Sequence, residues 1–175
     1  DIHQIAKSMG MDGRISPKFL HPGPGYGGSC FPKDTKAVAA TGDQHGVDMS
    51  VIKAVIAAND RQKVITAGKL VRLMGGSPQG KTVAVLGLAF KAETDDIRES
   101  PAIDIVQELL REGATVRAFD PEAMDTFKTA VVGQGPFGGN LNSDLQEKIA
   151  EAAASRLHYC EDEFDALQGA DAVII

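Results

Sequence analysis

Residues 81–120 contain two apolar segments on either side of a helical pattern, and this limits the possible folds more than any other feature. Residues 81–90 read Lys-Thr-Val-Ala-Val-Leu-Gly-Leu-Ala-Phe, which is typical of a buried β-strand. A Ser-Pro pair at 100–101 is a helix cap followed by a favoured first-turn proline, and apolar residues then recur at helical spacing. Residues 114–120 form the second apolar segment. This pattern predicts a βαβ unit, with parallel strands and a right-handed crossover.

The rest of the C-terminal half extends this unit. We predict a helix over residues 143–155, a strand over 156–160, a short helix over 162–167 and a last strand over 170–175. The segment 121–140 is predicted to be a long loop with little helix, and its glycine-rich part, 133–139, is expected to be mobile. The half is therefore an α/β structure with a Rossmann-like parallel sheet.

The N-terminal half has helical patterns only. Residues 1–9 and 34–41 are predicted helices, the second ending at Gly42. A longer helix is predicted over residues 48–74, about 38 Å long at 1.5 Å per residue, which suits a spacer or a dimer-forming helix. Its polar residues 59–61 are expected to be a solvated face. We therefore predict a central helical domain over 1–75 and an α/β domain over 76–175, both parts of a longer protein.

Composition excludes several classes of function. The net charge of −6 argues against a nucleic-acid surface, and no apolar run approaches the roughly 20 residues of a membrane span. The two cysteines, Cys30 and Cys160, lie in unlike settings, so a cytoplasmic protein with reduced thiols is expected rather than a disulfide. The histidines are scattered and form no cluster with metal-ligand spacing, so no metal is expected.

A glycine-rich segment around Cys30 is the first candidate site. It reads Pro-Gly-Pro-Gly-Tyr-Gly-Gly-Ser-Cys-Phe-Pro-Lys-Asp over residues 22–34, and its backbone can approach a ligand closely. Cys30 precedes a predicted helix N-terminus and stands near Lys33, and both features favour the thiolate. Asp34, one turn further on, could orient or deprotonate a water. The alternative is that Cys30 is a small buried apolar residue in an ordinary loop.

A second candidate site follows the first predicted strand. Residues 87–101 read Gly-Leu-Ala-Phe-Lys-Ala-Glu-Thr-Asp-Asp-Ile-Arg-Glu-Ser-Pro. Ligands of open α/β sheets bind beyond the carboxyl ends of the strands, where Phe90, Lys91 and Arg98 offer an aromatic face and two cations to an anion. Only Gly87 of a dinucleotide fingerprint is present, so Asp120 at the end of the second strand is a weak candidate for ribose binding. The alternative is a plain solvated loop.

Both motifs resemble the signatures of one family. Residues 27–34, Gly-Gly-Ser-Cys-Phe-Pro-Lys-Asp, resemble the catalytic-cysteine signature of the UDP-glucose/GDP-mannose dehydrogenase family. Residues 87–101 resemble its second signature, Gly-Leu-Ala-Phe-Lys followed by Thr-Asp-Asp-x-Arg-x-Ser-Pro. A phenylalanine at position 31 resembles the family members that oxidise UDP-glucose, whereas the members that oxidise GDP-mannose commonly have leucine at this position. The two signatures appear in the family's order, and the resemblance covers essentially the whole chain.

The resemblance implies roles for particular residues. Cys30 would be the nucleophile and Asp34 would orient the hydrolytic water, while Lys33 and Arg98 would serve the NAD cofactor. Arg14, sixteen residues before the cysteine, would reach the nucleotide diphosphate in a neighbouring subunit. The other implied substrate-binding residues are Phe19, Leu20, His21, Pro22, Gly23, Tyr26, Gly27, Phe90 and Lys91.

The resemblance also implies an activity. It is the NAD-dependent four-electron oxidation of UDP-glucose to UDP-glucuronate, through a thiohemiacetal and a thioester on Cys30, in a homodimer built on the central helix. An upstream NAD-binding domain is implied, so this chain alone is expected to be inactive. Two alternatives remain: a GDP-mannose 6-dehydrogenase, and a non-catalytic nucleotide-binding or dimerisation module.

Overall fold

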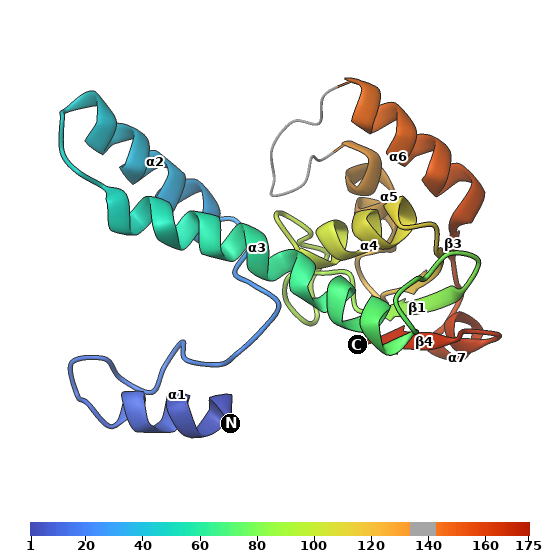
Figure 1. The fold of residues 1–175 in the computed structure, drawn as a ribbon, viewed down its shortest axis with the longest axis horizontal. Helices are drawn as coiled ribbons and strands as arrows, with labels where there is room; N and C mark the ends of the chain where they lie inside the picture. Colours follow the sequence, from blue (N-terminus) through green and yellow to red (C-terminus); the bar gives the residue numbers. More distant parts are fainter. Residues whose placement is uncertain (134–142) are drawn as a thin grey trace.

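The computed structural model describes residues 1–133 and 143–175. Three helices form the N-terminal part, and a parallel sheet with its own helices forms the C-terminal part (Figure 1). The long helix α3 (Ser50–Leu73) extends from the first part into the second, where it packs against α4 (Pro101–Arg111). Within the described residues, no helix is both long enough and apolar enough to cross a membrane.

The N-terminal part consists of α1 (Ile2–Gly10), α2 (Phe31–Gln44) and α3, of which α2 and α3 pack together. The prediction that Gly42 ends the second helix is wrong, because α2 continues to Gln44. Gly42 is buried where a β-carbon would collide with the side chain of Met49, so packing explains this glycine. Helix α1 buries none of its residues and lies apart from the α2–α3 pair (Figure 1).

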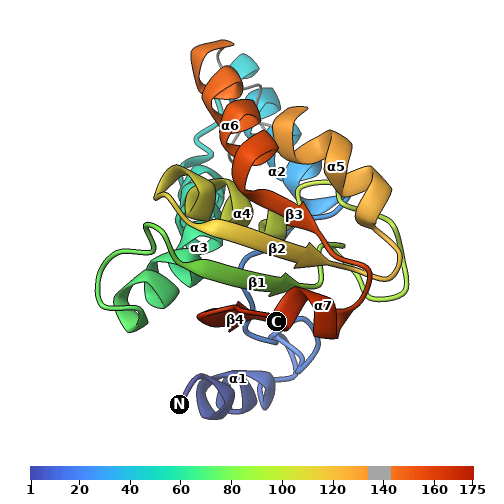
Figure 2. The same ribbon diagram turned by 90° about the vertical axis from the view of Figure 1, so that its right-hand side faces the viewer.

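The sheet confirms the predicted parallel α/β fold. Its strands are β1 (Thr82–Leu86), β2 (Thr115–Phe119), β3 (Leu157–Tyr159) and β4 (Ala172–Ile174), all parallel, in the order β3-β2-β1-β4 (Figure 2). Helix α4 connects β1 to β2, and α7 (Glu163–Leu167) connects β3 back to β4. Because these crossovers run in opposite directions across the sheet, right-handed connections place α4 and α7 on opposite faces.

Helix α4 is the centre of the core. Ser100 caps it by accepting a hydrogen bond from the Ala102 N–H, and Pro101 is its first residue, as the sequence predicts. Its apolar side chains pack with those of β1 and β2, and burying each large one contributes about 2 kcal/mol. The fully or almost fully buried members are Ile103, Val106, Leu109, Leu110, Val83, Val85 and Val116.

Residues 121–140 are predicted to form a loop, and this prediction is wrong for the residues that the structure describes, 121–133. Helix α5 (Met124–Gly133) forms there, although its threonines and valines have low helix propensity. Burial of Phe127, Ala130 and Val131 on one face stabilises it, so tertiary packing outweighs the local preference. The rest of the expected mobile segment lies outside the described residues. Helix α6 (Ser143–Arg156) then leads into β3.

Candidate functional site

A cavity of about 680 Å³ brings the two sequence motifs together. One wall comes from the segment before α2, and the other comes from the loop that follows β1. Its lining residues are Phe19, His21, Gly23, Gly25, Tyr26, Gly27, Ser29, Cys30, Phe31, Phe90, Lys91 and Asp96. The predicted nucleophile therefore lies in one cavity with the predicted anion-binding residues, although some 60 residues separate them in sequence.

Helix α3 holds the cysteine segment from behind. The Asn59 side chain accepts a hydrogen bond from the Tyr26 N–H at 2.7 Å and donates to the Tyr26 carbonyl at 2.9 Å. Nε2 of Gln62 donates to the Gly23 carbonyl at 2.9 Å. The prediction that residues 59–61 form a solvated face is therefore wrong for Asn59, which is buried. A carboxamide has one donor and one acceptor side, which matches the N–H and C=O of a single backbone residue.

Gly27 and Gly28 allow the two motifs to touch. The Gly28 N–H donates to the Arg98 carbonyl at 2.8 Å. A β-carbon on Gly27 would overlap the Glu99 carbonyl, and one on Gly28 would overlap the Phe90 ring. Phe90 thus stacks where both residues lack side chains, and only glycine permits this approach.

Cys30 occupies the N-cap position of α2, with Pro32 in the first turn. Its thiol is free and exposed, and Oγ of Ser29 lies 3.7 Å from its Sγ. Nζ of Lys33 lies 2.8 Å from Oδ1 of Asp34, and this contact holds the pKa of Lys33 above its usual value, so the lysine stays charged. A helix N-terminus and a cation near a cysteine both stabilise a thiolate.

Cys30 also lines a smaller cavity, of about 330 Å³, together with Lys33 and Arg98. The Arg98 guanidinium makes two hydrogen bonds to Asp96, at 2.8 and 2.9 Å. These bonds hold the pKa of Asp96 below its usual value. Two cations beside the thiol suit an anionic ligand.

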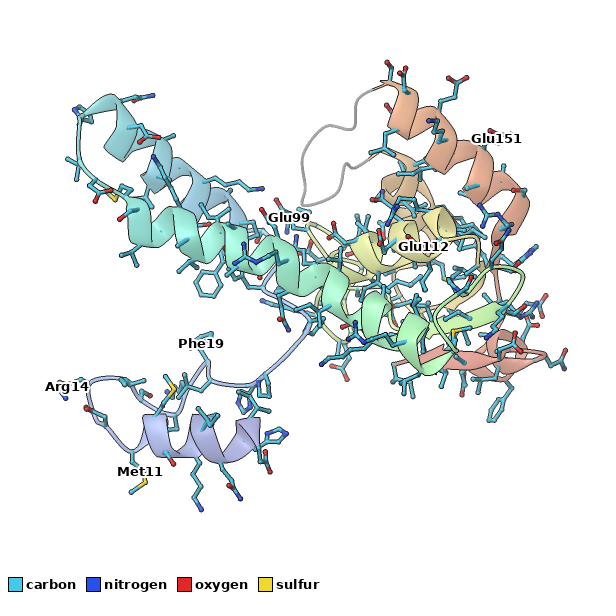
Figure 3. All side chains as sticks on the ribbon, in the orientation of Figure 1. Met11, Arg14, Phe19, Glu99, Glu112 and Glu151 are labelled. Carbon is cyan, nitrogen blue, oxygen red and sulfur yellow. The ribbon has the colours of Figure 1, made fainter. Side chains whose placement is uncertain are left out.

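Three aromatic rings that contact one another line the main cavity. Phe31 contacts Phe19 and Tyr26 edge to face, with ring centroids 6.3 and 6.1 Å away. Phe19 extends from the segment after α1 toward the α2–α3 pair (Figure 3), and 86% of its surface is exposed. Its backbone is left-handed, with φ of 63°, which is uncommon outside glycine. Aromatic rings that line a cavity offer stacking surfaces to a ligand.

Four of the predicted site residues line neither of the two cavities that contain Cys30. Pro22 lines a different cavity of about 600 Å³, which also includes Leu86 at the carboxyl end of β1. Asp34 lines neither cavity that contains Cys30, and its carboxylate faces solvent. Leu20 is half-buried. Arg14 pairs with Asp12 in the segment that follows α1, and Figure 3 shows it away from the α2–α3 pair.

Asp120 has a structural role. Its buried carboxylate accepts hydrogen bonds from the N–H groups of Leu88, Ala89, Glu122 and Ala123. Burial raises the pKa of Asp120, but these donors outweigh it, and the pKa lies below its usual value. With both oxygens bound to the backbone, the carboxylate fixes the loop that carries Phe90 and Lys91, instead of holding a ribose.

We expect acid to remove the stability that Asp120 contributes. Because its pKa is lowered on folding, the contribution is complete above the usual pKa of 3.8 and is lost as pH falls below it. Wild type should therefore exceed Asp120→Asn in unfolding free energy by about 1–3 kcal/mol at pH 7, and by less at pH 3. Urea unfolding at both pH values measures this, and an equal difference at both would contradict it.

Alkylation should distinguish the two cysteines. Cys160 is buried, and burial together with nearby acidic groups raises the pKa of its thiol, whereas Cys30 is exposed at a helix N-terminus. We therefore expect iodoacetamide to modify Cys30 at least about tenfold faster than Cys160 at pH 7. Peptide mass spectrometry over time gives both rates, and equal rates would contradict the expectation.

Comparison with known proteins identifies the family to which the chain belongs. Residues 1–61 match the central domain of the UDP-glucose/GDP-mannose dehydrogenase family, and residues 84–175 match the UDP binding domain of the same family. The chain therefore belongs to the UDP-glucose/GDP-mannose dehydrogenase family. It is 43% identical over 154 residues to UDP-glucose 6-dehydrogenase of Rhizobium meliloti, an alignment that covers 88% of this chain and 34% of that protein.

Two solved structures have the same fold. A UDP-glucose dehydrogenase from Pyrobaculum islandicum superposes with a TM-score of 0.77 at 32% identity, covering 99% of this chain and 35% of that one. A GDP-mannose dehydrogenase from Pseudomonas aeruginosa superposes with a TM-score of 0.64 at 25% identity, covering 99% and 36%. The chain thus spans about a third of the length of these relatives.

Proposed function

We propose that this chain carries the catalytic cysteine and much of the sugar-nucleotide site of an NAD-dependent UDP-glucose 6-dehydrogenase. The observation that supports this most strongly is the shared cavity, which is lined by Cys30, Phe90 and Lys91 and in which Gly27 and Gly28 lie against the Phe90 ring. The names of the curated relatives support the substrate. The chain corresponds to only a third of those proteins, so the activity belongs to a polypeptide that supplies the remaining parts.

Different residues of the chain would bind different parts of the sugar nucleotide. The Lys91 ammonium would neutralise the diphosphate, and the rings of Phe19, Tyr26 and Phe90 would cover the apolar faces of the nucleotide and sugar. The four glycines within residues 22–28 have no side chains, which would allow the sugar to come close to the thiol. The remaining residues of this proposed substrate site are Leu20, His21, Pro22, Gly23 and Gly27.

Cys30 carries the chemistry. After the C6 alcohol has become an aldehyde, the Cys30 thiolate adds to the carbonyl carbon, and the oxygen takes up a proton to give a thiohemiacetal. Loss of a hydride and that proton converts the adduct to a thioester. A water then adds to the thioester carbon, the C–S bond breaks, and the acid and the free thiol remain. We assign Asp34 to the orientation of this water, which requires its carboxylate to leave Lys33.

The cofactor fits the cations beside the thiol. NAD would supply the hydride acceptor for both oxidations. Lys33 and Arg98, which line the smaller cavity next to Cys30, have the charge to hold its phosphates. The exposed Arg14 would leave Asp12 to reach a neighbouring subunit of a homodimer that packs through the long helix α3. We place the junction between a central domain and a UDP-binding domain in residues 75–80, and we expect the chain by itself to be inactive.

A substrate comparison tests this proposal. The full-length polypeptide that contains this chain is supplied with NAD and either UDP-glucose or GDP-mannose, and the acid product is measured by mass spectrometry. We expect acid from UDP-glucose and at most about a hundredth of that rate from GDP-mannose. Acid from GDP-mannose only would retain Cys30 as the nucleophile and change the substrate. Acid from neither would favour a non-catalytic nucleotide-binding or dimerisation module.

A further inference from the structure

Helix α3 contains a completely buried lysine that the proposed reaction does not use. Nζ of Lys63 lies 2.9 Å from Oε2 of Glu99 and 3.6 Å from Oδ2 of Asp104 at the start of α4. A buried ammonium is costly unless it is paired, and removing one partner leaves the other charge stranded. These contacts therefore fix the angle between α3 and the loop that precedes α4.

Glu99 is the residue on which these contacts converge. Its second carboxylate oxygen accepts a hydrogen bond from Nζ of Lys36, on α2, at 2.8 Å. Figure 3 shows Glu99 beside α3, where the loop after β1 reaches that helix. Burial raises the pKa of Glu99, but the two lysines outweigh it and the pKa lies below its usual value, so the carboxylate is charged at neutral pH.

The main chain of Glu99 is as constrained as its side chain. Its φ is 50°, a left-handed conformation that costs energy in a residue with a β-carbon. In this conformation its carbonyl lies directly against Gly27, and the preceding carbonyl, of Arg98, accepts the Gly28 N–H at 2.8 Å. Residues 98 and 99 therefore form the surface on which the cysteine segment rests.

We propose that Glu99 is a positioning residue: held by Lys63 and Lys36, its backbone sets the place of Cys30 relative to Phe90 and Lys91. It links α2, α3, the cysteine segment and the loop after β1, and so joins the region that matches the family's central domain to the region that matches its UDP binding domain. Glu99 itself lines the smaller cavity, but its carboxylate is occupied by the two lysines. The consequence for turnover rests on the proposed function, whereas the consequence for the order of the cysteine segment does not.

Glu99→Gln tests this in the full-length polypeptide. Glu93→Gln is the matched control, because Glu93 is in the same loop, also has a left-handed backbone, with φ of 60°, and is exposed. Hydrogen exchange of the peptide containing residues 23–34 should speed by tenfold or more in Glu99→Gln and by less than twofold in Glu93→Gln. Exchange in β1 and β2 should not change in either variant.

Turnover supplies a readout that a purely structural role would not change. Because misplacement by about 1 Å can cost about 10²-fold in rate, kcat of Glu99→Gln should fall at least tenfold while KM for UDP-glucose rises less than threefold. The double variant Lys63→Met/Glu99→Gln should lose no more kcat than the more impaired of the two single variants, because both substitutions break the same Lys63–Glu99 ion pair. If Glu99→Gln also accelerates exchange in β1 and β2, the Lys36→Met variant is tested in its place. Lys36→Met removes the partly exposed Lys36–Glu99 ion pair and leaves the buried Lys63–Glu99 pair intact.

The outcomes separate the two proposals. Wild-type exchange in residues 23–34 together with wild-type kcat in Glu99→Gln would overturn the positioning role. A wild-type protein that fails to oxidise UDP-glucose would overturn the proposed function, and the exchange measurement would still decide the role of Glu99. Faster exchange confined to residues 23–34, with a loss in kcat, is the expected result.

Discussion

Replacement of Cys30 with serine in the full-length polypeptide should reduce the formation of UDP-glucuronate by at least about 10³-fold, the scale on which removal of a nucleophile acts. Serine is almost entirely protonated at neutral pH and adds weakly to an aldehyde, and an oxygen ester would be released more slowly than a thioester. We therefore expect the Cys30→Ser variant to stop after the first oxidation, as an aldehyde or as a stable adduct. Intact-protein mass and product analysis after one turnover distinguish these two forms.

Cys160→Ser is the control for this substitution. Cys160 is the other cysteine, is buried beyond the end of β3 and lies outside both cavities that contain Cys30. Its replacement should leave acid formation within about twofold of wild type, in the range of a substitution distant from the site. Acid formation at the wild-type rate in Cys30→Ser would eliminate the covalent role of Cys30.

Gly27→Ala should be the most damaging substitution among the glycines that line the cavity. The added methyl group would overlap the Glu99 carbonyl and lie 3.0 Å from a carbon of the Phe90 ring, and the backbone carbonyl cannot rotate away as a side chain would. The cysteine segment must therefore move from Arg98 and Glu99, and Cys30 moves with it. We expect kcat/KM to fall by at least about 10²-fold, while most of the fold's stability remains.

Gly13→Ala is the matched control, because a β-carbon at Gly13 would meet no atom within 4 Å and the residue lies in the connector after α1. It should retain near wild-type activity. Circular dichroism and urea unfolding of both variants would show whether Gly27→Ala acts locally. An active Gly27→Ala protein would mean that the contact between the two motifs is not needed for catalysis.

Local signals in the sequence predict most of the elements. The Ser-Pro pair at 100–101 marks the start of α4 because its cap and its fixed φ act within one turn. Gly87, with φ of 89°, ends β1 after five residues, earlier than the apolar pattern indicates, because the chain turns there toward the site. The parallel sheet follows from the alternation of strands and helices.

Contacts between distant residues could not be predicted in this way. Helix α5 depends on burial of Phe127 against the core, which overrides its local propensity. Asn59 and Lys63 have the spacing of a polar helix face, yet both are buried because the cysteine segment and Glu99 cover them. The partners lie 33 and 36 residues away, and no pattern within one helix indicates them.

The cavity was likewise predictable only in part, because the sequence indicates its residues but not their proximity. The glycines and Cys30 indicate a ligand loop, and Phe90 with Lys91 indicates an anion site, but these residue types do not show that the two share a cavity. The resemblance to the dehydrogenase family supplies that expectation, and in the structure Cys30, Phe90 and Lys91 line the same cavity. The involvement of Asp34 and Arg14 remains a prediction, since both lie outside it.

The number of NADH molecules formed per UDP-glucose consumed tests the central claim most directly. The full-length polypeptide is given limiting UDP-glucose and excess NAD, and absorbance is followed to completion. Two NADH per sugar, with UDP-glucuronate as the product, is the predicted result, because capture by Cys30 carries the aldehyde on to the acid. One NADH per sugar with release of an aldehyde, or no NADH at all, would contradict the account.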